Sequence, residues 1–283
     1  MPKQRYVRAQ FLVFALFGDY ILPRGGWAQT QSLIELLGLL GVSSQAARST
    51  LSRITRQGWL QRRRNGRNSL YALTPKGQHL LEEGEKRIFE PRGQDWDGQW
   101  RVVVYSLPER KRGLREALRR RLSWLGFGPL APGTWVSPRD RRRELQALLI
   151  DLNAVPYVQC FVGQWLSDAS DRAMVERCWN LDDLNSQYAA FLRKWKPELE
   201  RYVNRSSGAE DLEPSQCFVR RFWIVHEYSD FPNRDPNLPS ALLPEGWLGS
   251  EAARVFGEYH TLLSDRANTF IEETLRNRNR QSA

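Results

Sequence analysis

The stretch that decides the fold is residues 42–73, VSSQAARSTLSRITRQGWLQRRRNGRNSLYAL. Its first half predicts a helix, because a serine hydroxyl at position 43 or 44 can cap the first turn. Apolar residues recur along this helix at helical spacing: Ala47, Leu51, Ile54. Gly58 suits the end of the helix, since glycine adopts a left-handed conformation at the least cost. One face of the helix is therefore expected to pack into a core.

The opposite face of this predicted helix is polar. It carries Gln45, Arg48, Ser49, Ser52, Arg53 and Arg56. An arginine can bind guanine through two hydrogen bonds, a glutamine can bind adenine, and a serine can donate to phosphate. This pattern is typical of a helix that reads the major groove of duplex DNA.

The second half of the stretch predicts a β-hairpin over residues 59–73. Its turn is Asn65-Gly66, and both residues tolerate the positive φ that a tight hairpin needs. Four arginines crowd this turn: Arg62, Arg63, Arg64, Arg67. A basic hairpin after a reading helix predicts a winged helix-turn-helix, whose wing reaches phosphates or the minor groove. The alternative, an amphipathic helix with a solvated charged face, leaves the cap, the glycine and the hairpin unexplained together.

Further helices are predicted around this motif. Residues 7–17 and 30–40 form apolar segments of helical length, and a third helix is expected from Pro75 to about residue 89. The basic start and the apolar run that follows resemble a signal peptide, but the run is short and no small-residue cleavage site follows. We expect a core helix there, and a DNA-binding domain over residues 1–90.

Charge is distributed unevenly along the 283 residues, whose net charge is +10. Residues 1–90 hold 14 Lys or Arg against 6 Asp or Glu, a net charge of +8. The net charge is +6 over residues 91–165 and −4 over residues 166–283. The basic end coincides with the predicted winged helix, as expected for a surface that binds a polyanion. The acidic C-terminal third is expected to do something other than lie along DNA.

The three cysteines, Cys160, Cys178 and Cys217, are far apart and odd in number. This argues against a disulfide framework or a zinc site and favours buried structural thiols in a reducing cytosol. No apolar run approaches the ~20 residues that a membrane span needs. We therefore expect a cytoplasmic protein with no membrane partner.

A central α+β domain is predicted over residues 91–165. Strands are expected at 100–107, within 126–137 and at 155–162, with helices at 111–125 and 141–152. This order fits a ferredoxin-like sheet with two helices on one face. Two arginine runs, at 119–121 and 141–143, fit contacts with the DNA backbone, an acidic partner surface or a solvated helix face.

The C-terminal domain, residues 166–283, is predicted to be mostly helical. Helices are expected within 166–205, at 214–228 and at 250–275, and the last eight residues are expected to fray. A segment dense in proline, EYSDFPNRDPNLPSALLPEGW, lies between the last two helices at 227–247.

The chain resembles the PaaX-type repressors of phenylacetic acid degradation over nearly its whole length. The resemblance is carried by FGDYILPRGG at 17–26, QGWL at 57–60, WDGQWRVVVYSLPE at 96–109 and EYSDFPNRDPNLPSALLPEGWLGSEAARVF at 227–256. It implies a cytoplasmic homodimeric repressor with a winged helix, a central domain like the CRISPR-associated Cas2 ferredoxin-like fold, and a C-terminal helical domain. It also implies that phenylacetyl-coenzyme A, or another acyl-coenzyme A, releases the repressor from double-stranded operator DNA. No cofactor is implied.

An acyl-coenzyme A carries phosphates, adenine and an apolar acyl group, so its site needs cations, aromatic rings and an apolar pocket. Such residues gather before and within the proline-rich segment: Arg220, Arg221, Trp223, His226, Tyr228, Arg234. We regard them as candidates for the effector site, against the alternative that they form structural ion pairs and packing. Binding would favour a dimer arrangement in which the two reading helices no longer match the operator.

Catalysis is poorly supported by the sequence. The resemblance to Cas2 raises a metal-dependent nuclease, but the first central strand ends in Val104-Tyr105-Ser106 without an aspartate. The three histidines are scattered, and no phosphate-binding glycine motif is present. We predict no catalytic or metal-binding residue and no enzyme. Of the three function classes, the sequence best supports a ligand-responsive repressor. A ligand-independent DNA-binding regulator is second and a nuclease third.

Overall fold

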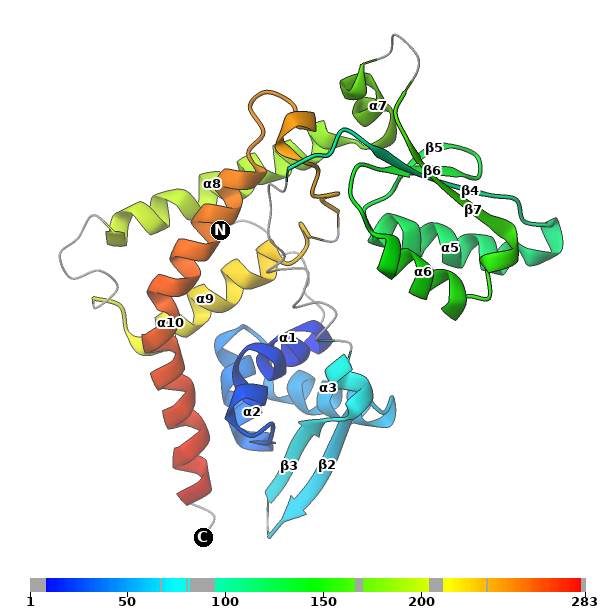
Figure 1. Ribbon diagram of the computed structural model, residues 1–283. Helices are drawn as coiled ribbons and strands as arrows, with labels where there is room; N and C mark the ends of the chain where they lie inside the picture. The colour runs from blue at the N-terminus through cyan, green and yellow to red at the C-terminus, as the bar shows by residue number, and fades with distance from the viewer. Residues whose placement is uncertain are drawn as a thin grey trace. The chain divides into compact units, whose positions relative to one another are not determined.

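The computed structural model describes residues 9–66, 68–79, 81, 95–165, 170–203, 211–232 and 234–280, a mixture of helices and two sheets (Figure 1). The chain packs as two compact units. The first holds Met1–Phe89, Trp195–Glu227 and Val255–Ala283, and the second holds Glu90–Lys194 and Tyr228–Arg254. These units group residues by packing. The three domains predicted above, 1–90, 91–165 and 166–283, remain a prediction about how the chain is divided.

The first unit begins with three helices and a small sheet. The helices are α1 (Ala9–Leu16), α2 (Thr30–Leu39) and α3 (Ser44–Arg56), and the strands are β1 (Ala28–Gln29), β2 (Leu60–Asn65) and β3 (Asn68–Leu73). A π-helical turn, Phe17–Ile21, and a 3-10 turn, Leu22–Arg24, continue directly from α1. The sheet is antiparallel in the order β1-β3-β2. The helix and hairpin predicted from residues 42–73 are confirmed.

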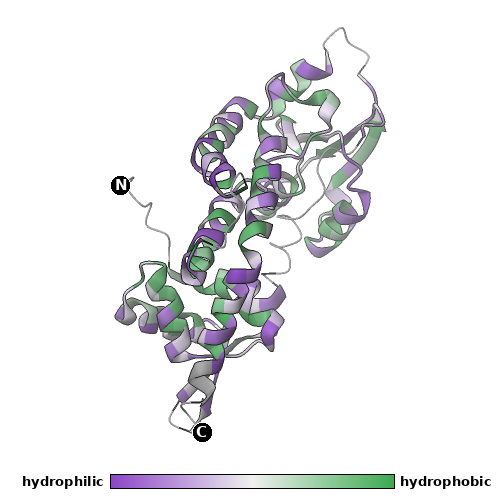
Figure 2. Cartoon of the chain, turned by 90° about the vertical axis from the view of Figure 1, so that its left-hand side faces the viewer, coloured by the Kyte–Doolittle hydropathy of each residue, from purple (hydrophilic) through white to green (hydrophobic). Residues whose placement is uncertain are grey.

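Apolar residues from these helices and strands are buried. Leu16 of α1, Leu37 of α2 and Leu51 of α3 are fully buried, and Leu73 of β3 is 1% exposed. Figure 2 shows how apolar and hydrophilic residues alternate around the helices. Residues 75–79 are helical after the sheet, as predicted, whereas the rest of that predicted helix lies almost wholly outside the described residues.

Two C-terminal helices pack against this N-terminal segment within the first unit. They are α9 (Pro214–Tyr228), whose bounds match the prediction, and α10 (Gly249–Arg280). The Tyr20 ring lies 5.4 Å from the Phe218 ring, and the Ser32 hydroxyl donates to the Thr274 carbonyl at 3.3 Å. Arg24 forms an ion pair with Glu272 at 3.4 Å. The N-terminal helices therefore share their packing with residues from the far end of the sequence.

The second unit is built on a four-stranded antiparallel sheet. Along the chain, β4 (Trp100–Tyr105), α5 (Arg112–Trp124), β5 (Gly128–Ala131), β6 (Thr134–Ser137), α6 (Arg142–Asp151) and β7 (Val158–Gly163) follow one another. The strand order is β5-β6-β4-β7. Figure 1 shows α5 and α6 on the same face of this sheet. The predicted order of strand, helix, strand, helix and strand is present, and the predicted strand region at 126–137 holds two strands, β5 and β6.

Each face of this sheet has its own core. On the face of α5 and α6, the predicted inward residues Leu118 and Leu122 are fully buried, with Leu145 at 7% exposed. On the other face, Trp100 and Val136 pack with Val175 and Cys178 of α7 (Asp171–Cys178). Both faces of the sheet thus carry buried core residues, whereas the edge strand β7 stays largely exposed, with Phe161 at 58%.

The predicted helical stretch 166–205 is divided rather than continuous. It contains α7 and α8 (Leu181–Val203), and the Asn180 side chain accepts a hydrogen bond from the backbone of Asp183 at 3.2 Å. Asn180 therefore starts a new helix, because such a side chain satisfies a free amide of the first turn. The final helix, α10, runs beyond its predicted end to Arg280, stabilised by an Arg276–Glu272 ion pair one turn apart at 2.8 Å.

Candidate nucleic-acid interface

The start of α3 is fixed by Ser43, which settles the choice between two serines. Its side-chain oxygen accepts a hydrogen bond from the backbone N–H of Ala46 at 3.3 Å, and its backbone is extended, as an N-cap requires. After the helix, Gly58 has a φ of +73°, which confirms the predicted left-handed glycine. Local sequence therefore sets both ends of this helix.

The two faces of α3 differ as the spacing predicts. Ala47, Leu51 and Ile54 are fully buried against the core of the first unit. The predicted reading residues are all exposed: Gln45, Arg48, Ser49, Ser52, Arg53, Arg56. The helix thus presents guanidinium, amide and hydroxyl groups together on one side, in the combination that contacts bases and phosphates.

The hairpin of β2 and β3, which carries the predicted arginines, follows α3 directly in the sequence. Arg62, Arg63 and Arg64 are exposed on β2, opposite Tyr71, Leu70 and Ser69 of β3. Gly66 has a φ of +56°, so the turn adopts the left-handed backbone that its glycine signalled. The predicted residue Arg67 lies outside the described residues.

Two tryptophans support basic side chains of this region, and the sequence reading missed both roles. The Arg63 guanidinium lies 4.4 Å from the centre of the Trp27 ring, and the Lys76 ammonium lies 4.1 Å from the centre of the Trp59 ring. A cation over an aromatic face is attracted by the negative potential of the ring. Trp27 precedes β1, and only the pairing of β1 with β3 brings it near the hairpin.

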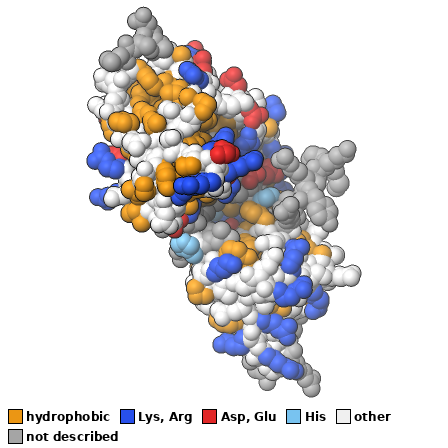
Figure 3. Space-filling view, turned by 90° about the vertical axis from the view of Figure 1, so that its right-hand side faces the viewer, with side chains coloured by type: hydrophobic (Ala, Val, Ile, Leu, Met, Phe, Trp, Pro, Cys, Tyr) orange, Lys and Arg blue, Asp and Glu red, His pale blue; other side chains and the backbone are white. Residues whose placement is uncertain are grey.

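Several cations of α3 and β2 have no carboxylate partner in the described part of the chain. Among the described residues, Arg48, Arg53, Arg56 and Arg62 have no ion-pair partner. Figure 3 shows lysine and arginine side chains spread over the lower part of the molecule, at the height of β2 and β3 in Figure 1, with few acidic ones among them. Unpaired cations on one surface favour a polyanionic partner, because each phosphate they meet releases counterions.

Comparison with known proteins identifies the family. Family models match in order along the chain: a PaaX-like protein model over residues 8–77, the PaaX protein central Cas2-like domain over 93–175, and the PaaX-like protein C-terminal domain over 179–273. The transcriptional repressor PaaX of Escherichia coli K12 is 33% identical over 265 residues, which cover 93% of this chain and 82% of that protein. The chain belongs to the PaaX family.

A solved structure shares the fold of this PaaX-family chain. The uncharacterised protein Rv0674 from Mycobacterium tuberculosis matches with a TM-score of 0.61 and 21% identity, over 93% of this chain and 98% of that one.

Within the part of the chain that the structure describes, no helix is both long and apolar enough to cross a membrane.

The six residues predicted to bind an effector, chosen for their charge and aromatic character, fall in both units. In the first unit, Arg220 forms an ion pair with Glu198, and the Arg221 guanidinium lies 5.0 Å from the centre of the Tyr20 ring. The Trp223 and His226 rings are 5.5 Å apart in the same unit. Arg221 is only 8% exposed. These side chains have neighbours within the first unit, but the Nε and Nη1 atoms of Arg221 are buried without a hydrogen-bond partner among the described residues.

The other two candidates lie in the second unit. Tyr228 is 1% exposed, with its ring 5.7 Å from that of Phe191 and 5.8 Å from that of Phe231. Arg234 forms an ion pair with Asp183 at 2.7 Å and a hydrogen bond with Gln187. The structure thus engages most of the six predicted effector residues in packing or ion pairs. Their role in binding an effector stays a prediction.

The two arginine runs of the central segment are partly neutralised. Arg121 pairs with Asp151 at 3.2 Å, Arg141 with Glu144 at 3.2 Å, and Arg142 with Asp140 at 3.7 Å. These pairs are mostly exposed and so contribute little to stability. Arg119 and Arg120 are exposed without an ion-pair partner among the described residues.

The described residues include all three cysteines and a number of potential metal ligands. Within these ranges, no group of three His, Cys, Asp or Glu side chains is placed to hold a metal ion. Cys178 and Cys217 are buried, as predicted, but Cys160 is exposed. The prediction of a buried thiol was wrong for Cys160 because it lies on β7, which pairs on one side only.

Proposed function

We propose that the protein is a DNA-binding transcriptional repressor that binds operator DNA as a homodimer in the cytoplasm. On this proposal α1–α3 and β1–β3 act as a winged helix-turn-helix. The observation that carries it is the exposed polar face of α3 followed by a basic hairpin. The curated relative in the family, itself a transcriptional repressor, supports the same conclusion.

The residues of this interface take two roles. Gln45, Arg48, Ser49 and Ser52 face outward from α3, and we assign them base contacts and nearby phosphate contacts. The remaining cations are assigned to the DNA backbone: Arg53, Arg56, Arg62, Arg63, Arg64, Arg67. In a dimer, two reading helices would meet half-sites about one helical turn apart, or a multiple of it.

We propose that the central segment is a ferredoxin-like domain with no enzymatic role. The strand order β5-β6-β4-β7 supports that fold, because the first and third strands along the chain lie in the centre of the sheet and all pairs are antiparallel. We propose that the repressor controls aromatic catabolic genes. Its effector would be an acyl-coenzyme A such as phenylacetyl-coenzyme A. It would stabilise a dimer arrangement that no longer fits the operator.

A gel-shift experiment on the region upstream of the protein's own gene tests this function. We expect a discrete complex that resists random competitor DNA and is lost when phenylacetyl-coenzyme A is added. A specific complex that ignores the thioester would favour a ligand-independent DNA-binding regulator. Failure to prefer any upstream fragment over random DNA would overturn the repressor.

A further inference from the structure

A cavity in the second unit opens where β4 ends. It has a volume of about 550 Å³ and lies between the end of β4, helix α5 and the hairpin of β5 and β6. This size falls within the range of small-molecule sites, ~300–1,000 Å³. The hairpin closes tightly on the strand: Gly133 has a φ of +76°, and its carbonyl accepts a hydrogen bond from the Tyr105 backbone at 2.8 Å.

Gly133 is required for this closure. A Cβ atom at that position would lie 2.6 Å from the Tyr105 carbonyl oxygen, closer than such atoms approach in proteins. The positive φ adds a second reason for glycine. The wall of the cavity is therefore built by a close approach of two backbones.

The lining of this cavity combines positive charge with an apolar wall. Arg115 and Arg119, one helical turn apart on α5, both face it, and no Asp or Glu lines it. Trp135 and Tyr105 form part of the wall and are 6% and 8% exposed. Ser106, which is exposed, also lines the cavity.

The two arginines differ in their existing partners. Arg115 is held in place, since its guanidinium donates to the Leu107 carbonyl and to the Glu109 carboxylate, each at 3.1 Å. Arg119 is exposed and has no ion pair among the described residues. The cavity thus contains one anchored cation and one cation available to a ligand.

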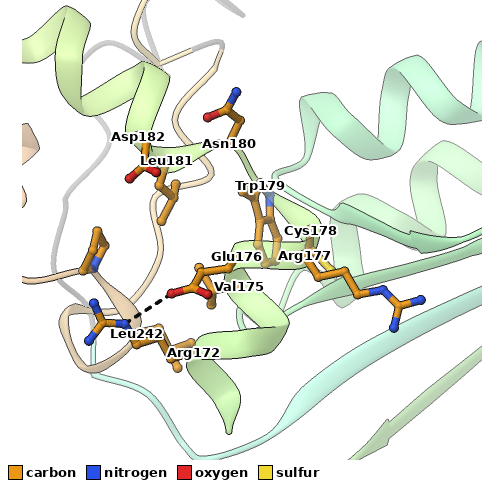
Figure 4. A pocket seen from close by; sticks show the side chains of 11 residues that line it. Arg172, Val175, Glu176, Arg177, Cys178, Trp179, Asn180, Leu181, Asp182 and Leu242 are labelled. Atoms are coloured by element: carbon orange, nitrogen blue, oxygen red, sulfur yellow. Dashed lines mark ion pairs between the residues drawn. The ribbon is translucent and has the colours of Figure 1, made fainter. Parts of the chain in front are cut away.

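A second cavity of about 450 Å³ provides the contrast. It surrounds Trp179, between α7 and the start of α8 (Figure 4). Its Arg172 forms an ion pair with Glu176 at 3.5 Å, and the carboxylate of Asp182 also lines it. In Figure 4 the Arg177 side chain points away from this group. Charges of both signs here do not select an anion.

We propose that the cavity at the end of β4 binds an organic anion, one that joins a phosphate or carboxylate to an apolar group. Arg119 binds the anionic group, and the wall of Trp135 and Leu107 accepts the apolar part. The inference deepens the proposed function, because such a ligand is of the same chemical class as the proposed effector. It assigns that ligand to residues of the central sheet and α5 rather than to the residues predicted at 220–234.

Isothermal titration of the full-length protein tests this placement, with phenylacetyl-coenzyme A, free coenzyme A and phenylacetate as probes. The first variant is Arg119→Gln. Arg120→Gln is the matched control, because Arg120 is also exposed on α5, lacks an ion pair among the described residues and does not line the cavity. Arg234→Gln represents the residues predicted from sequence. Comparing free coenzyme A with phenylacetate shows whether phosphate or carboxylate provides the anion.

We expect Arg119→Gln to weaken binding roughly tenfold or more, because glutamine cannot form the charged hydrogen bonds of the guanidinium. Arg120→Gln should bind as the parent protein does. Three outcomes would overturn the placement. Arg119→Gln could bind as tightly as the parent protein, Arg234→Gln alone could lose binding, or no probe could bind at all. A defect of Arg119→Gln confined to DNA binding would also overturn it.

Operator binding is measured on the same samples without ligand. A parent protein that binds its operator but none of the probes keeps the repressor proposal and rejects the cavity. A parent protein that binds a probe but no operator keeps the cavity proposal and rejects the repressor proposal.

Discussion

The Arg63 guanidinium lies 4.4 Å from the centre of the Trp27 ring, which ties the basic hairpin to the residue that precedes β1. The two side chains reach each other across β3, which pairs with β1 on one side and β2 on the other. Arg63 is therefore held on the hairpin, and a held guanidinium loses less conformational entropy when it meets a phosphate.

Replacing Trp27 should weaken DNA binding without changing its sequence preference. We expect Trp27→Ala to lower affinity about two- to fivefold for all duplexes, since an exposed cation–π contact contributes ~0.5–1 kcal/mol. Trp27→Phe should recover most of the loss. Fluorescence anisotropy on operator and random DNA measures both, and circular dichroism checks that the fold is kept. If the parent protein and Trp27→Ala bind DNA with equal affinity, the Trp27 ring contributes packing but does not support DNA binding.

Replacing Arg48 and Arg63 should have different effects on recognition. Arg48→Ala on α3 should cost ~1–3 kcal/mol of discrimination between operator and random DNA, because a base contact is lost. Arg63→Ala should weaken both duplexes alike and reduce the slope of log K against log salt by about 1, because a phosphate contact is lost. Salt titrations on both duplexes separate the two. An equal loss on both duplexes for Arg48→Ala would remove its assignment to a base.

Loss of the Ser43 cap should destabilise the protein through α3. The Ser43 side chain accepts the Ala46 N–H at 3.3 Å, and Ser→Ala at an N-cap costs ~1 kcal/mol. The control is Ser44→Ala, since Ser44 is exposed in the first turn and is not the cap. Urea unfolding followed by tryptophan fluorescence should show a lower midpoint for Ser43→Ala alone. The same decrease in both variants would contradict the assignment.

His260 should make the protein less stable in mild acid. Burial, together with the nearby Arg221 charge, lowers the pKa of His260 from 6.5 to about 4. The unfolded chain then binds the proton first, so the free energy of unfolding falls as pH decreases from about 6.5 to 4 and is unaffected by this group above that range. Urea midpoints at pH 8 and pH 5 measure the effect.

Substitution isolates the contribution of this histidine. His260→Gln should lose less stability between pH 8 and pH 5 than the parent protein, whereas His79→Gln, on an exposed residue, should behave as the parent does. A parent-like decrease in His260→Gln would assign the acid sensitivity to other groups.

The features that sequence predicted well are those set by neighbours along the chain. Three such features are the spacing of Leu51 and Ile54, the serine before α3 and the Asn65-Gly66 turn. Each depends only on residues a few positions away, so the sequence predicts it directly. The same holds for the leucines of α5, of which Leu118 and Leu122 are fully buried. The division of α7 from α8 was missed because Asn180 resembles any polar residue inside a helical pattern.

The features that sequence missed depend on residues far apart in the chain. Trp27 reaches Arg63 only through the β1–β3 pairing, and Glu198 meets Arg220 from another helix. No spacing rule reports such contacts, which is why the residues chosen at 220–234 as ligand groups were found with structural partners. The cavity at the end of β4 was missed for the same reason, since a hairpin and a helix create it together.

The contact between Arg24 and Glu272 spans 248 residues of sequence. At a synthesis rate of about 5–20 residues per second, the ribosome adds those residues in roughly 12–50 s. Tyr20, which ends fully buried against Phe218, must wait for α9 throughout most of that time. The strands of the central sheet have all emerged well before then, so the segment that we propose binds DNA completes its packing later than those strands are made. A truncated chain without α10 would keep every residue that we propose contacts DNA, yet lack the packing that completes their support.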